Sequence, residues 1–156
     1  MRQHEIMDRV NSFSERMLLH YASPNRDLIV EIMQLDANRF STLHDADLSK
    51  YILVLGQYLV MLQHNDNLKN IEHVLTTKSL EHELNIKKMT ADIPASMKTE
   101  KDKRAWLITN NESLAQLEEE AMAVEAEYTL ISGMGKAVEA LLNALKKEKS
   151  ARGGFE

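Results

Sequence analysis

The last third of the chain carries an apolar residue at every third or fourth position without interruption. The average spacing is about 3.5 residues, which predicts a long helix packed lengthwise along another helix. This seam comprises Leu114, Leu117, Ala121, Val124, Tyr128, Ile131, Gly135, Val138, Leu142 and Leu145. A second apolar set beside the seam makes the stripe wider than one partner helix needs. We therefore expect the seam to join subunits as well as to form the spine of the fold.

Similar spacing predicts two short helices and one long helix before the seam. Residues 5–21 and 24–35 are expected to form amphipathic helices, with Ser23 as the N-cap of the second. A long helix is predicted over 45–89, where apolar positions again alternate by three and four. The polar run 64–67 either splits this helix or lies within it. We favour a continuous or slightly kinked helix, because neither Gly nor Pro follows until Pro94.

Capping residues mark the elements that follow. Thr99 and Asp102 resemble a capping box and predict a short helix that ends near Ile108. Thr109, three residues before Glu112, predicts the start of the final helix, which we expect to run to about Lys149.

Two glycines interrupt apolar runs. Gly56 lies inside the predicted long helix, where a missing side chain permits close approach of another helix. Gly135 occupies a position of the seam, where it permits either close backbone contact or a local kink.

These elements define the fold class and the domain organisation. No alternation of apolar and polar residues typical of strands occurs, so the fold is predicted to be all-α. The two long helices are expected to form an antiparallel hairpin or coiled-coil core over residues 45–152, with shorter helices in residues 1–44. The whole chain is predicted to be a single domain of 156 residues. Self-association into a bundle or ring is the alternative way to cover the stripe, and we favour a homo-oligomer.

The composition and the absence of long apolar runs indicate the cellular compartment. The chain has no Cys, which excludes disulfides and thiolate chemistry. It has neither a signal-peptide block nor an apolar run long enough to span a membrane, so a cytoplasmic protein without membrane contact is expected.

Motifs of catalysis and of metal or cofactor binding do not occur in the sequence. Residues 133–136 lack the spacing of a phosphate-binding loop, and the six His are scattered. Glu81, His82 and Glu83 are consecutive on a helix and diverge by about 100° each, so they cannot converge on a metal ion. We expect a protein that is not an enzyme and that has no metal site or cofactor.

A short basic segment is the strongest candidate for a binding site. Six basic and three acidic residues lie between Lys87 and Arg104, next to Trp106, which is the single Trp. Cations beside an aromatic side chain are typical of single-stranded nucleic-acid binding. Alternatively, Trp106 anchors the short helix on the core, and the charges are solvated. The candidate binding residues are Lys87, Lys88, Lys98, Lys101, Lys103, Arg104 and Trp106.

The order of these parts resembles a family of phage proteins. A helix rich in Leu and Tyr, a long helix, the basic segment 97–106 and a heptad helix ending at 142–149 are similar to UvsY-like recombination mediators of tailed phages. The resemblance covers about residues 48–152. It implies a ring-forming accessory protein, phage-encoded and acting in the host cytoplasm, that binds single-stranded DNA, helps to displace the single-strand-binding protein and loads a recombinase. It assigns DNA contact to the basic segment and assembly to the seam.

The charge distribution supports an alternative function. The net charge is −5, and six Glu without any Lys or Arg lie between Glu112 and Glu127. Phosphate neutralisation supplies much of the affinity for DNA. The alternative is therefore a helical protein-interaction module, such as an assembly factor or an inhibitor of a host protein, without direct nucleic-acid binding.

Overall fold

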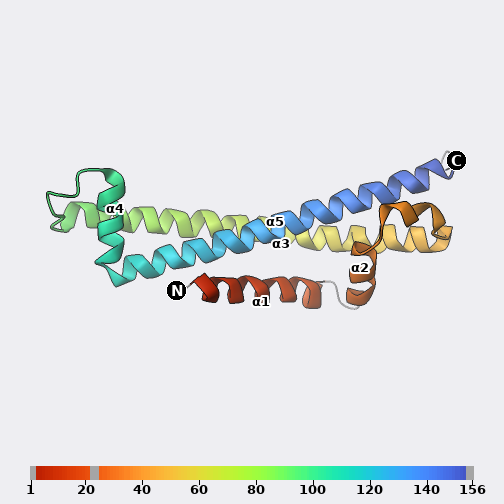
Figure 1. Cartoon of the computed structure of the whole chain (residues 1–156), viewed down its shortest axis with the longest axis horizontal. Helices are drawn as coiled ribbons and strands as arrows, with labels where there is room; N and C mark the ends of the chain where they lie inside the picture. Colours follow the sequence, from red (N-terminus) through yellow and green to blue (C-terminus); the bar gives the residue numbers. More distant parts are fainter. Residues whose placement is uncertain (1–2, 22–24, 154–156) are drawn as a thin grey trace. The chain divides into compact units, whose positions relative to one another are not determined.

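The computed structural model describes residues 3–21 and 25–153, and within them it is helical without any strand. The predicted all-α class is confirmed. The elements, shown in Figure 1, are α1 (Gln3–Tyr21), α2 (Arg26–Met33), the 3-10 helix η1 (Ala37–Thr42), α3 (Asp45–Thr90), α4 (Glu100–Thr109) and α5 (Glu112–Ala151).

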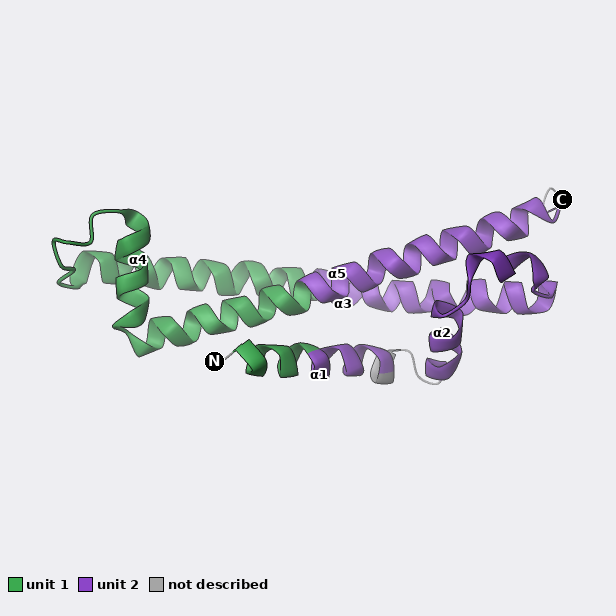
Figure 2. Ribbon diagram, viewed as in Figure 1, with its two compact units in different colours: residues 1–10, 68–128 green, residues 11–67, 129–156 purple. Residues whose placement is uncertain are grey.

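The chain forms two compact units, each built around a stretch of α3 and a stretch of α5 (Figure 2). Unit 1 combines Met1–Val10 with Leu68–Tyr128, and unit 2 combines Asn11–Asn67 with Thr129–Glu156. Unit 1 thus pairs the end of α3 with the beginning of α5, and unit 2 pairs the beginning of α3 with the end of α5. This pairing is the predicted antiparallel arrangement of two long packed helices.

Unit 2 buries apolar residues from four helices. Phe13 and Met17 of α1, Ile29 and Ile32 of α2, and the inner positions of α3 and α5 are all shielded from solvent. Inner positions of α3 recur every three or four residues, because one face of a helix returns at that spacing. Those positions are Leu48, Tyr51, Leu55, Tyr58 and Leu62.

Arg152 fastens the end of α5 to the start of α3 in unit 2. Its guanidinium donates to the carbonyl oxygens of Phe40 (2.9 Å) and Leu43 (2.6 Å) and to Oδ1 of Asp45 (2.9 Å). It also donates to Glu148 on its own helix. The hydrogen bonds to Asp45 and Glu148 raise the pKa of Arg152.

Unit 1 has a smaller apolar core, which holds α4 against the long helices. Leu80 and Leu84 of α3, Leu107 of α4 and Leu114 of α5 form one buried cluster. Trp106 and Ile108 are partly buried against it.

The polar run at 64–67 lies within a continuous α3, as the favoured alternative predicted. Asn65 donates from Nδ2 to the carbonyl oxygen of Met61 at 2.8 Å, so its side-chain amide has a hydrogen-bond partner on the same helix. The predicted cap at Ser23 and the helix start at Pro24 lie outside the described residues, and α2 begins at Arg26.

One predicted cap is confirmed and the other is wrong. The Thr99 hydroxyl accepts the backbone N–H of Asp102 at 3.0 Å and caps α4. Thr109 does not cap α5, because α4 extends through Thr109 and gives it a helical backbone. Asn111 is the cap instead, and its Oδ1 accepts the N–H of Leu114 at 3.2 Å.

The two glycines in apolar runs do not bring helices of this chain close together. No heavy atom lies within 4 Å of the position that a Cβ would take at Gly56 or Gly135, so the expected close approach is absent at both described sites. Gly135 instead borders a small hollow lined by α3 and α5 residues of unit 2, including Leu59, Asp66 and Glu139.

In the described part of the chain, no helix contains an apolar stretch long enough to cross a membrane.

Candidate nucleic-acid interface

The basic segment surrounds the turn between α3 and α4 in unit 1. Helix α3 ends at Thr90, and Pro94 lies in the loop that follows. Pro cannot donate a backbone hydrogen bond and therefore does not continue a helix. The cap at Thr99 then starts α4, and Leu107 anchors this helix in the core of the unit.

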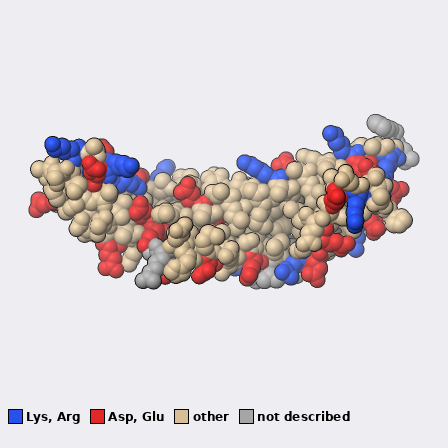
Figure 3. Space-filling view, viewed as in Figure 1, with Lys and Arg blue, Asp and Glu red and all other residues tan. Residues whose placement is uncertain are grey.

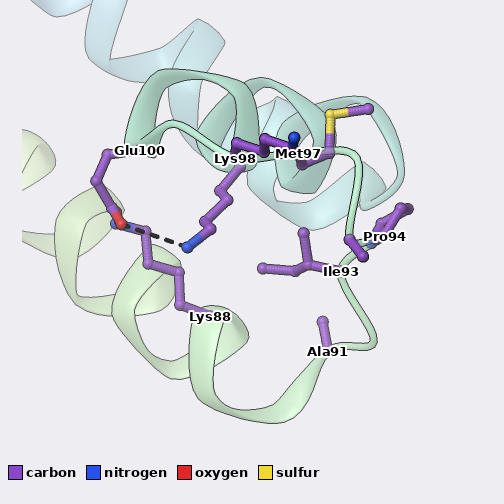
Figure 4. A pocket seen from close by; sticks show the side chains of 9 residues that line it. Lys88, Ala91, Ile93, Pro94, Met97, Lys98 and Glu100 are labelled. Carbon is purple, nitrogen blue, oxygen red and sulfur yellow. Dashed lines mark hydrogen bonds and ion pairs between the residues drawn. The ribbon is translucent and has the colours of Figure 1, made fainter.

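A hollow of about 640 Å³ opens at this turn (Figure 4). Its lining combines apolar loop residues with three Lys and one Glu: Lys88, Ala91, Ile93, Pro94, Ala95, Met97, Lys98, Glu100 and Lys103. Figure 4 shows the side chains of Lys88 and Glu100 meeting across the hollow from α3 and α4. The hollow is therefore cationic, but it already contains a carboxylate of its own.

Glu100 forms ion pairs with two of the predicted DNA-binding cations. Lys88 donates from Nζ to Oε2 of Glu100 at 2.6 Å, and Nζ of Lys103 lies 3.7 Å from Oε1. The hydrogen bond from Lys88 is the main cause of a lowered pKa at Glu100, with further contributions from the charges of Lys88 and Lys103. Glu100 is thus ionised at neutral pH and partly neutralises the hollow.

A third cation, on α4, is paired with a carboxylate of α3. Arg104 donates from Nη1 to Oε1 of Glu81 on α3 at 2.6 Å. The remaining three cations, Lys87, Lys98 and Lys101, form no ion pair among the described residues. Figure 3 shows Lys and Arg side chains mixed with Asp and Glu side chains at the end of unit 1 that holds α4. The structure brings all six predicted cations to one turn and divides them into a paired and an unpaired set.

Trp106 is placed mainly by packing. It is partly buried against the cluster of Leu80, Leu84, Leu107 and Leu114, and its carbonyl oxygen accepts the N–H of Asn110 at 3.0 Å. The packing role weighed from the sequence is the one observed. A base would find only part of the ring available for stacking.

The seam of α5 packs against other helices of the same chain. Leu114, Val124, Ile131, Val138, Leu142 and Leu145 are buried, whereas Leu117, Tyr128 and Gly135 are partly buried. Tyr128 lies beside His73 of α3, with ring centroids 5.6 Å apart. The seam therefore forms the spine of each unit, and its buried positions are not available to a second subunit.

Sequence reasoning missed a buried ionic cluster in unit 1. The side chain of Glu127 is 1% exposed, and it pairs with Arg9 of α1 and with Lys69 of α3, the latter at 3.0 Å. Arg9 also reaches Glu120 at 2.7 Å, and the hydrogen bond to Glu120 is the largest cause of a raised pKa at Arg9. One signal was available: Glu127 follows Val124 by three residues and precedes Ile131 by four, which is the spacing of a core position.

The chain matches no protein family model, no curated protein and no solved structure. Among the described residues, no group of three or more His, Asp and Glu side chains is arranged to hold a metal ion.

Proposed function

We propose that the chain is an oligomeric accessory protein of phage-type recombination or replication, which binds single-stranded DNA at the turn between α3 and α4 and assists recombinase loading. The resemblance to UvsY-like mediators suggests the biological process. Direct partners would be single-stranded DNA, a recombinase or a single-strand-binding protein, and further copies of the chain.

The unpaired set of lysines is the observation that carries the proposal. Lys87 stands at the end of α3, Lys98 in the loop and Lys101 in the first turn of α4, so free cations line both sides of one turn. Lys87 and Lys101 lie on helices, and α4 is capped by Thr99 and anchored by Leu107, so these two cations are placed without requiring the chain to fold on binding. Phosphates spaced along a flexible strand can contact such a row.

Removing the unpaired lysines tests this directly. We expect the triple variant Lys87→Ala, Lys98→Ala, Lys101→Ala to bind labelled single-stranded DNA at least about tenfold more weakly at ~50 mM salt, and to lower the salt slope by about 2, since each single-strand phosphate contact contributes ~0.7. Fluorescence anisotropy at several salt concentrations measures both quantities.

The matched control removes the same charge elsewhere. Lys146, Lys147 and Lys149 are three exposed lysines near the end of α5, and their replacement by Ala is expected to change affinity less than threefold or so by general electrostatics. Equal losses in the two triple variants, or no binding by the natural chain at ~50 mM salt, would refute the proposed interface.

Glu100 provides a gain-of-affinity test. Glu100→Gln keeps the shape of the side chain and releases Lys88 and Lys103 from their internal anion. We expect binding to single-stranded DNA to strengthen by about two- to fivefold at low salt, because two more cations can neutralise phosphates. Asp92→Asn, at an exposed carboxylate in the loop, is the control for the loss of one negative charge. An unchanged affinity of Glu100→Gln would mean that DNA does not enter the hollow.

A protein-interaction module without nucleic-acid binding is the second candidate. It is favoured by the internal pairing of Lys88, Lys103 and Arg104 and by the packing of Trp106 into the core. The same anisotropy titration separates the two candidates, because this one predicts no salt-dependent binding of DNA.

A further inference from the structure

Unit 2, purple in Figure 2, contains an apolar hollow that the proposed function does not use. The hollow has a volume of about 270 Å³ and is lined by residues of α1, α2, α3 and α5, all of which belong to unit 2. Most of the lining side chains are apolar, and the two polar ones are Gln34 and Tyr58. Small-molecule sites in proteins commonly combine an apolar lining with a few polar groups. The hollow therefore has the composition of a ligand site.

The hollow has a buried floor and an open rim. Ile29 of α2 and Val138 of α5 are each 2% exposed and lie at the floor. Met33, which is 41% exposed, and the exposed Ala137 lie at the rim, so a molecule can enter from solvent. Protein interiors are otherwise close-packed, and side chains beside a void lose dispersion contacts. A molecule of matching shape supplies those contacts.

Tyr58 is the buried polar residue of the hollow. The residue is 2% exposed, and its hydroxyl has no hydrogen-bond partner among the described residues. Burial raises the pKa of Tyr58 to about 12, so the hydroxyl keeps its proton at neutral pH. Buried polar groups are nearly always paired, because an unpaired one costs free energy. The Tyr58 hydroxyl is thus a donor that an acceptor atom in the hollow can satisfy.

The lining and the volume define the chemical class of the ligand. No Lys, Arg, Asp or Glu lines the hollow, so an ionic group would lose its hydration there without gaining a counter-charge. A cavity of ~150 Å³ lined by apolar side chains holds benzene, so the volume of about 270 Å³ accommodates about ten non-hydrogen atoms. Met33 and Met134 line the hollow, and their flexible thioethers make favourable contacts with aromatic rings.

We infer that this hollow binds a small, neutral, apolar molecule that carries one hydrogen-bond acceptor, such as an aryl ketone or ester. The apolar side chains contact the body of the molecule, and the Tyr58 hydroxyl donates to its acceptor oxygen. The site shares no residue with the DNA contact proposed for unit 1. It is a further binding function, and it stands or fails independently of DNA binding.

Acetophenone, which has this size and one carbonyl oxygen, is the probe. NMR of isotope-labelled methionine methyl groups is expected to show saturable shifts at Met33 and Met134, with a dissociation constant below about 1 mM. Met89 and Met122 of unit 1 are exposed and do not line the hollow, so their signals are expected to stay in place. Shifts that do not saturate, or equal shifts at all four methionines, would overturn the inference.

Tyr58→Phe tests the hydrogen bond. The change removes a hydroxyl that has no partner in the chain, so the fold is expected to persist. Acetophenone is expected to bind about threefold or more weakly, whereas α-methylstyrene, which has a methylene group in place of the carbonyl oxygen, is expected to bind within about twofold of its original affinity. An equal change for both compounds would refute the role of Tyr58 as donor.

Ala137→Phe tests the place of binding. Ala137 is exposed at the rim, so a larger side chain there covers the hollow without entering the core, and acetophenone is expected to bind at least about tenfold more weakly. Ala140→Phe, at an exposed position of α5 that does not line the hollow, is the control and is expected to leave binding unchanged. Equal affinities of the two variants would contradict the site. So would shifts of Met33 and Met134 with protein concentration alone, because they would show that a second copy fills the hollow.

Discussion

Replacing Ile131 by Asp is expected to unfold the chain or to leave it barely folded at room temperature. Ile131 is 0% exposed and lies in the seam of α5, so the substitution puts a carboxylate in an apolar core with no cation provided. We expect a loss of about 4 kcal/mol or more in the free energy of unfolding, against a total of ~5–15 kcal/mol for typical domains. Urea denaturation followed by circular dichroism at 222 nm measures it.

Thr129→Asp is the control for the cost of Asp inside a helix. Thr129 is exposed and only two residues away on α5. Its substitution is expected to cost less than about 1 kcal/mol, because Thr and Asp have similar helix propensities. A stable Ile131→Asp protein with an unchanged urea midpoint would show that the seam does not form the spine described above.

Glu127→Ala is expected to cause the second large loss of stability. The change leaves Lys69, whose side chain is 13% exposed, and Arg9, at 30%, beside an empty space without their shared carboxylate. Breaking a buried ion pair from one side costs about 3–5 kcal/mol, and the partial exposure of Arg9 and its second partner Glu120 place the expected value near 3 kcal/mol. The urea midpoint should fall without a change in slope.

The neighbouring Glu125 separates this effect from loss of a negative charge. Glu125 is exposed on the same helix, and Glu125→Ala is expected to change stability by less than about 0.5 kcal/mol. If Glu127→Ala lowered stability no more than Glu125→Ala, the cluster with Arg9 and Lys69 would not hold the first residues of α1, up to Val10, in unit 1.

The sequence predicted the helices well because their periodicity is strong. The spacing of Leu48, Tyr51, Leu55, Tyr58 and Leu62 reflects the face that the fold buries, so the pattern carried the packing information directly. The boundary at Thr109 was harder. Two capping-type residues, Asn110 and Asn111, follow it, and the packing of Leu107 and Ile108 on the core extends α4 by one residue more than predicted.

The sequence predicted where the candidate interface lies, but not which of its cations form ion pairs. Charge counting located the cations around the turn. It could not show that Glu81 meets Arg104, since these residues are 23 positions apart and come together only through the docking of α4 on α3. The reach of Arg9 to Glu127, over 118 positions, is likewise a tertiary contact with no local signature.

The buried position of Glu127 also determines how α3 and α5 can be aligned. An apolar seam repeated by heptads tolerates a slide of about seven residues, because one Leu replaces another at each contact. Such a slide would set Glu127 against Leu62 or Thr76 instead of Lys69, leaving a carboxylate buried without a cation. In unit 2, Arg152 donates hydrogen bonds to the carbonyl groups of Phe40 and Leu43, and these bonds also form in only one alignment of α3 and α5. Few polar contacts thus select one register among the several that the apolar residues alone would accept.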